Sequence, residues 1–148
     1  MCKPFILKIL TRDFGEVEIS EDDVITFTEP IFGFKDYSRF AVLTEESIGP
    51  DFAWLQSVED ASVCFILVNP STVVGQYNPV LPKRVAELIE TDEPMFWLVA
   101  VLRDTLEKST VNLKSPIVIN PVSKSAAQVI LEDDLPIRYP LMGSKGGL

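Results

Sequence analysis

The chain has 148 residues, 47% of them hydrophobic, and its 13 Lys and Arg against 22 Asp and Glu give a formal charge of -9. This length fits one domain with its own core. A negative field of this size repels phosphate backbones and attracts basic partners, so the charge argues against nucleic acid as a direct ligand.

Cysteine usage and hydropathy indicate the compartment. Cys2 and Cys64 are too few for a disulfide framework, and Cys64 lies in the apolar run "VCFILV", which predicts a buried structural thiol. No segment reaches roughly 18 uninterrupted apolar residues, and "MCKPFILKIL" is followed by the charged "TRDFGE" without a cleavage site. We therefore expect a soluble, cytoplasmic protein that does not engage a membrane.

Short β-type phrases dominate the first half of the chain. They are rich in β-branched and aromatic residues and bounded by Gly, Pro, Asp or Ser, as strands are. In "GEVEIS", Val17 and Ile19 alternate with Glu16 and Glu18, which is typical of a half-exposed antiparallel strand. The predicted strands are residues 4–10, 15–20, 23–28, 39–44, 52–57 and 62–69.

One helix is predicted near residues 83–90, because Pro82 opens "PKRVAELIE" and apolar residues recur there at helical spacing. The next phrase, "MFWLVAVLR" at 95–103, is apolar on both faces, and the helix is its expected cover. Three further strand phrases follow, "STVNL", "PIVIN" and "AAQVIL". The sequence predicts a mainly β domain over residues 1–142, an antiparallel sandwich or flattened β-barrel with one short helix, and a flexible tail at 143–148.

Four phrases in order and spacing resemble the flagellar assembly factor FliW family. The first, "GEVEISEDDVITFTEPIFGFKDYSRFAVL", contains the family's "GxxGF"-like phrase as "PIFGF". The others are "FAWLQSVEDASVCFILVNP", "STVNLKSPIVINP" and "QVILEDDLPIRYPL", so the resemblance covers roughly residues 10–141. The chain departs from the family at "SKSAAQ", which stands where a basic, glycine-bearing turn is expected.

Several residues of these phrases are interpreted as structural. Gly33, before Phe34, serves a turn that needs a positive φ, and the Asn side chains satisfy turn backbone groups. The structural set is Gly33, Phe34, Asn69, Pro70, Asn112, Pro116 and Asn120. Trp54 and Trp97 are predicted to be core residues, as aromatics at inward strand positions usually are.

The resemblance implies a protein with no enzymatic role and no cofactor. Members of the family bind flagellin and, once flagellin has been exported, bind the dimeric RNA-binding regulator CsrA instead, which prevents that regulator from silencing flagellin translation. An RNA-binding regulator presents a basic face, so acidic residues of this chain are the candidate contacts. They are Glu16, Glu18, Asp22, Asp23, Glu132, Asp133 and Asp134.

The two "EDD" runs, at 21–23 and 132–134, lack the alternating acidic and glycine pattern of a calcium loop, so no metal site is expected. The sequence contains no histidine, which removes Ser–His and Cys–His nucleophile systems. The alternative function is a small-ligand-binding or enzymatic β-barrel with a cavity between its sheets, but the strand interiors offer almost no convergent polar cluster. A generic scaffold module is the third reading.

Overall fold

The computed structural model describes residues 5–142 and is dominated by short strands. The elements are β1 (Ile6–Thr11), β2 (Gly15–Ser20), η1 (Glu21–Asp23), β3 (Ile25–Phe27), β4 (Arg39–Glu45), β5 (Gly49–Ser57), β6 (Cys64–Val68), η2 (Pro70–Thr72), α1 (Lys83–Ile89), β7 (Met95–Val101), η3 (Leu106–Lys108), β8 (Thr110–Val111), β9 (Ile117–Ile119), β10 (Ser125–Gln128) and β11 (Tyr139–Pro140). The mainly β prediction is confirmed, and so is the predicted helix. The tail predicted for 143–148 lies outside the described residues.

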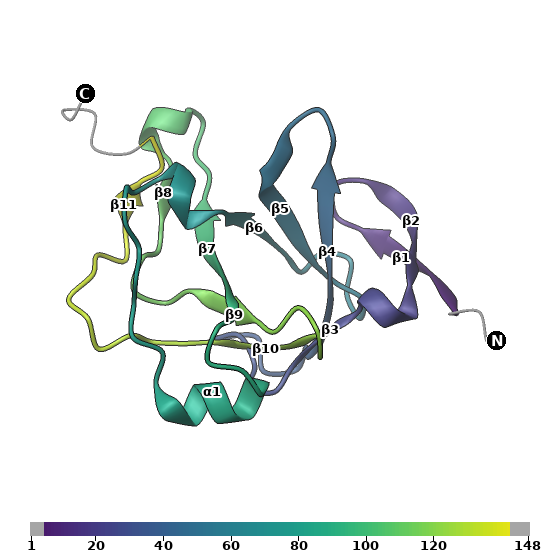
Figure 1. The fold of residues 1–148 in the computed structure, drawn as a ribbon. Coiled ribbons are helices and arrows are strands. Elements are labelled where there is room, and N and C mark those ends of the chain that lie inside the picture. The colour runs from purple at the N-terminus through teal and green to yellow at the C-terminus, as the bar shows by residue number, and fades with distance from the viewer. Residues whose placement is uncertain (1–4, 143–148) are drawn as a thin grey trace.

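Nine strands form one sheet in the order β11-β8-β7-β6-β5-β4-β3-β10-β9. β9 also pairs with β7, and this second pairing closes seven of the strands into a barrel (Figure 1). The barrel is therefore the correct one of the two predicted architectures. One pairing departs from the antiparallel prediction, because β10 runs parallel to β3, with Ser125 opposite Thr26.

The barrel interior is filled by large apolar side chains. Phe40, Leu55, Leu67 and Ile117 are fully buried there, and Trp97 is 8% exposed. Because side chains alternate along a strand, residues next to these positions face outward. These side chains fill the middle of the barrel, so the pocket that the barrel leaves lies at one end and not between two sheets, where the alternative prediction placed a ligand cavity.

The position of Trp54 shows that the prediction of a core residue was wrong there. Trp54 precedes the inward-facing Leu55 on β5, so it points to the outer face of the barrel, where it is half-buried. Trp97 is a core residue as predicted.

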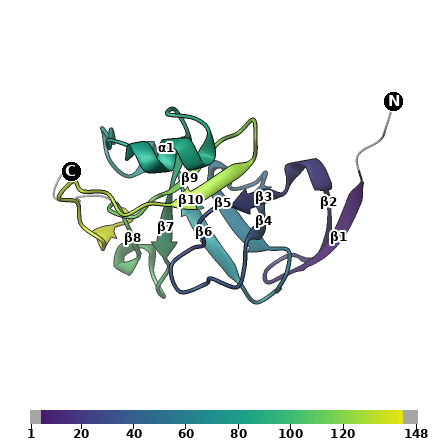
Figure 2. The same cartoon turned by 90° about the horizontal axis from the view of Figure 1, so that it is seen from below.

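The outer face of the barrel is covered in two places. Val85 and Ile89 of α1 pack on Val118, Ala127 and Val129, so the helix lies across β9 and β10 (Figure 2). The prediction that this helix covers β7 is wrong except at Phe96, which borders the same cluster. The chain after β7 and the segment between β6 and α1 cover that strand instead. Val73, Val74 and Tyr77 of that segment pack on a cluster formed by Val68, Leu98, Ala100, Val111, Leu113 and Leu141.

The residues predicted to be structural lie at turns. Gly33 has a φ of +85°, and Phe34 N donates to Ile31 O at 2.8 Å. Asn69 accepts from Ser71 N at 3.1 Å and so caps η2, in which Pro70 is the first residue. The side chain of Asn112 accepts from the backbone N–H groups of Lys114 and Ser115 at 3.0 and 2.9 Å, and Pro116 O accepts from Val129 N at 3.1 Å.

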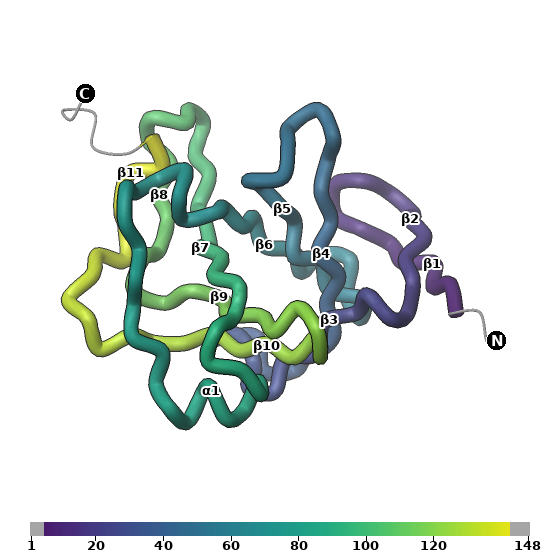
Figure 3. Tube along the Cα trace, viewed as in Figure 1, coloured from purple at the N-terminus to yellow at the C-terminus, as the bar shows by residue number. Residues whose placement is uncertain are grey.

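The hairpin β1–β2 forms a two-stranded sheet of its own beside β4, at the purple end of the tube in Figure 3. Its turn is fastened to the barrel by Arg12, whose backbone N donates to Gln56 Oε1 at 2.9 Å and whose Nη1 donates to Cys64 O at 3.0 Å. These bonds hold the turn of the hairpin against β5 and the start of β6. No helix within residues 5–142 has the length and hydropathy needed to cross a membrane.

Candidate functional site

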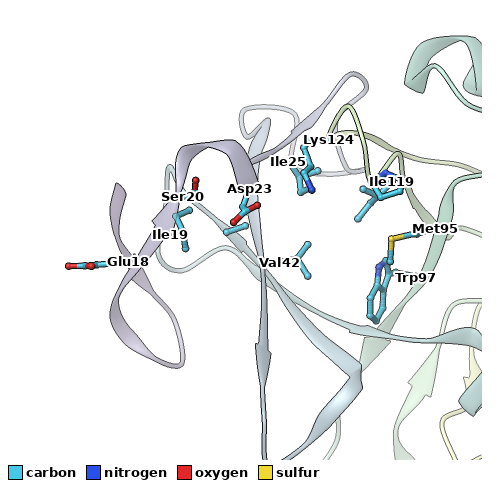
Figure 4. Close-up of a pocket in the computed structure, with 12 residues that line it drawn as sticks. Glu18, Ile19, Ser20, Asp23, Ile25, Val42, Met95, Trp97, Ile119 and Lys124 are labelled. Atoms are coloured by element: carbon cyan, nitrogen blue, oxygen red, sulfur yellow. The ribbon is translucent and has the colours of Figure 1, made fainter. Parts of the chain in front are cut away.

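A pocket of about 410 Å³ opens at the end of the barrel that faces β2 and η1, and we call it the mouth pocket. Its floor is apolar, because Ile25, Val42, Trp97 and Ile119 come from inward positions on four barrel strands. Figure 4 shows the Trp97 indole beside Met95 at the bottom of this floor. The mouth pocket thus lies on the last layer of core side chains at this end of the barrel, in which Ile25, Trp97 and Ile119 are still buried.

Polar side chains stand on the rim of the mouth pocket. Glu18 and Ser20 come from β2, Asp23 from η1, and Lys124 from the turn before β10. In Figure 4 the Asp23 carboxylate lies between the hairpin and the apolar floor, whereas the Glu18 carboxylate points away from the floor. The rim therefore carries the Asp23 carboxylate and the Lys124 ammonium group beside an apolar centre, with the Glu18 carboxylate on its outer side.

The local sequence explains why Asp23 reaches the rim. Ser20 is the N-cap of η1, and its hydroxyl accepts from Asp22 N at 3.2 Å. The capped 3-10 turn ends at Asp23, after which Val24 and Ile25 are buried. Asp23 is thus the last exposed residue before the chain enters the barrel.

The seven predicted contact residues fall on two separate surfaces. Glu16, Glu18, Asp22 and Asp23 lie on β2 and η1, but only Glu18 and Asp23 line the mouth pocket. Glu132 and Asp133 line another pocket, of about 380 Å³, with Val80 and Pro82, and Asp134 is exposed next to them. The hairpin and the segment before β11 lie on opposite sides of the molecule in both Figure 1 and Figure 2.

Sequence reasoning missed the floor of the mouth pocket and its basic residue. Trp97 and Ile119 look like ordinary core residues in the sequence, and only the folded barrel shows that they also line the floor of a pocket at its end. The sequence did contain a signal for Lys124. Lys124 belongs to "SKSAAQ", the departure from the glycine-bearing turn, and its φ is +65°.

The arrangement is suited to binding. Within the described residues no group of three His, Cys, Asp or Glu side chains is placed to hold a metal ion. Burial raises the pKa of the Cys64 thiol, so the thiol stays protonated and unreactive. What the mouth pocket offers a ligand is apolar area and carboxylate charge.

Comparison with known proteins agrees with this fold. Residues 8–141 match the family model described as "FliW protein". The "Flagellar assembly factor FliW" of Lachnoclostridium phytofermentans is 35% identical over 139 residues, which are 90% of this chain and 89% of the relative. That of Syntrophus aciditrophicus is 36% identical over 143 residues, 94% of this chain and 90% of the relative.

A solved structure shares the fold as well. "Crystal structure of the flagellar assembly factor FliW" superposes with a TM-score of 0.86 at 29% identity and covers 94% of this chain and 99% of that chain. The expected resemblance is thereby confirmed over nearly the whole sequence. The chain belongs to the FliW family of flagellar assembly factors.

Proposed function

We propose that this chain is a non-enzymatic regulator in the cytoplasm that binds flagellin and, alternatively, the dimeric RNA-binding regulator CsrA. Binding to CsrA relieves its repression of flagellin translation. Membership in a family of flagellar assembly factors supports this role, and so does the formal charge of -9, which favours a basic partner. The proposed mechanism needs neither a cofactor nor a bond-making step.

The mouth pocket is the single observation that carries the proposal. A Lys or Arg side chain of the regulator can lay its aliphatic stem on Met95, which is 45% exposed, and on the half-buried Val42 while its charged end meets Asp23. Such a contact combines buried apolar area with opposite charge.

Antagonism follows from charge. This chain carries 22 acidic residues, and it brings that charge to a basic surface that RNA phosphates would otherwise neutralise. RNA and this chain then weaken each other's binding to the regulator. Thermodynamic linkage requires the factor to be the same in both directions.

The binding test uses charge reversal at the two acidic surfaces. We expect Glu18→Lys together with Asp23→Lys to weaken binding to the purified regulator by about tenfold, because each exposed charge pair is worth up to about 1 kcal/mol and reversal adds repulsion. Glu132→Lys with Asp134→Lys makes the same change of net charge at the other surface and is the matched control. Equal weakening by both pairs would show that only net charge matters and not the mouth pocket.

The antagonism has its own test. The regulator is titrated with this chain in the presence and absence of its target RNA, at low and at physiological salt. We expect weaker binding when RNA is present, and a slower association rate at the higher salt. Identical affinities in the two titrations, or a stable complex between this chain and RNA alone, would refute the mechanism.

A further inference from the structure

A second surface of the molecule is almost purely apolar. A groove of about 440 Å³ runs over the outer face of β5 and β6, and its main side chains are Ile48, Phe52, Trp54, Ile66, Leu102 and Leu106. We call it the outer groove. Ile48 is 52% exposed, Leu102 49% and Leu106 57%, although the three come from two different loops. Large exposed apolar side chains that converge on one groove mark an interaction site rather than chance exposure.

The outer groove has a fixed shape. The Trp54 ring is held edge-on by Phe14, with ring centroids 4.8 Å apart. At the same end, Arg12 Nη2 and Asp13 Oδ2 form an ion pair at 3.0 Å, and Arg12 together with the Trp54 side chain lowers the pKa of Asp13. The charges at this end are thus paired with each other. The groove is left with apolar side chains to offer a partner.

Strand pairing decides which kind of segment fits. β5, β6 and β7 each have neighbouring strands on both sides, so the floor of the outer groove has no open strand edge. A partner lying there must satisfy its own backbone hydrogen bonds, and an α-helix does so. Charge sets the flanks of that helix, because Glu45 and Glu46 are close to Ile48 in the β4–β5 turn and the whole chain is acidic.

We propose that the outer groove binds an amphipathic α-helix of a protein partner, with an apolar stripe facing Trp54 and basic residues beside Glu45 and Glu46. This rests on the proposed function only in assuming that the chain acts by binding proteins. The outer groove and the mouth pocket share no lining residue. The chain therefore has two docking surfaces, one dominated by apolar burial and one that also uses charge.

The test uses a fluorescent 18-residue model peptide of Leu and Lys, with Leu at helical spacing, and a control peptide of the same composition in scrambled order. Leu106→Glu and Ile48→Glu place a charge in the outer groove at exposed positions, which keeps the fold intact. Val122→Glu makes the same change at a side chain that is 89% exposed and lies outside the outer groove. Amide NMR spectra of each variant confirm folding and locate the bound peptide.

We expect the helical peptide to shift amide signals around Trp54 and Ile66, and each variant in the outer groove to weaken it by at least about tenfold. Val122→Glu should change affinity by less than about twofold. Binding should persist at high salt better than binding to the regulator does. Equal weakening by Leu106→Glu and Val122→Glu, tight binding of the scrambled peptide, or shifts confined to the mouth pocket would overturn the proposal.

Two other occupants give different outcomes. If sedimentation shows a dimer that Leu106→Glu dissociates, a second copy of the chain fills the outer groove and the proposal is wrong. A tenfold gain in peptide affinity on deleting residues 143–148 would assign the outer groove to the chain's own tail and also overturn it. The regulator is measured in parallel with Leu106→Glu. If Leu106→Glu loses peptide binding but keeps regulator binding, the proposal is supported. If the wild-type chain binds the peptide but does not bind the regulator, only the proposed function fails.

Discussion

Phe14 and Trp54 meet edge to face, with ring centroids 4.8 Å apart and ring planes at 80°. Phe14 lies in the turn of the β1–β2 hairpin and Trp54 on the outer face of β5, so this contact joins the separate two-stranded sheet to the barrel. It also links the two surfaces described above. The same hairpin supplies Glu18 to the mouth pocket, and Trp54 is the floor of the outer groove.

Phe14→Ala should loosen the hairpin. We expect the free energy of unfolding to fall by about 2 kcal/mol, because a half-buried ring and its edge-to-face contact are lost. Urea denaturation gives the magnitude, and hydrogen exchange should show faster opening in residues 6–20 than in the barrel. Phe32→Ala removes a ring that is 53% exposed and is the control. Uniform exchange changes across the whole chain would contradict this role of Phe14.

Asn120 fastens the helix to the sheet. Its Nδ2 donates to Ile89 O at 2.8 Å, which is a carbonyl of the last turn of α1, and its Oδ1 accepts from Val122 N at 2.9 Å. Asn120→Ala should cost about 2 kcal/mol, since buried backbone groups lose their partners. Asn78→Ala, at an exposed position, is the control. A loss below about 0.5 kcal/mol by urea denaturation would show that water replaces the amide.

The strands were predictable because local chemistry specifies them. "GEVEIS" alternates between apolar and acidic residues and forms β2 over the predicted residues, Gly15–Ser20. A barrel was one of two predicted architectures, but which strands close it was not predictable, because the pairing of β7 with β9 joins Phe96 to Val118 across a long stretch of chain that no local pattern encodes. The prediction that α1 covers β7 was wrong for the same reason.

The site was predictable only in part. Acidic charge pointed to Glu18 and Asp23, which do reach one pocket, but it could not separate them from Glu132 and Asp133 on the other side of the molecule. Trp54 illustrates the remaining difficulty. A shift of one residue along a strand decides whether an aromatic side chain points into the core or lies at the bottom of an exposed groove. The phrase "FAWLQS" is apolar enough on both faces to fit either orientation.

The ionisation of Asp60 should make the stability of the folded chain depend on pH. Hydrogen bonds from Ser62 to this carboxylate, and a further one from the Tyr37 hydroxyl, lower the pKa of Asp60 in the folded state. A lowered folded-state pKa adds stability above the unfolded pKa of about 3.9, and this contribution is lost as the pH falls through the folded-state value. Wild type should therefore be more stable than Asp60→Asn near pH 7, and the difference should shrink below about pH 4.

Urea denaturation from pH 3 to pH 7 measures the effect of Asp60. Asp36→Asn changes one charge in a neighbouring turn and corrects for net charge. A difference between wild type and Asp60→Asn that stays constant over this range would show that the hydrogen bonds to Asp60 do not depend on its ionisation.

Lys124 connects the unusual turn to the mouth pocket. Its φ of +65° is left-handed, a conformation that costs a side chain with a Cβ about 1–2 kcal/mol and costs glycine nothing. Lys124→Gly should raise the free energy of unfolding by about 0.5–1 kcal/mol, because greater freedom of the unfolded glycine offsets part of the relief. The change also removes the ammonium group from a rim that holds Glu18 and Asp23, so a basic partner should bind more tightly.

Two further substitutions serve as controls for the Lys124→Gly measurement. Glu90→Gly, at a φ of +63° after α1, should stabilise the chain by a similar amount without touching the mouth pocket. Ser123→Gly lies in the same turn without a positive φ and should destabilise it. If Lys124→Gly stabilises the chain as Glu90→Gly does, yet the affinity for the regulator is the same in both variants, the turn matters for the fold alone and the regulator binds away from the mouth pocket.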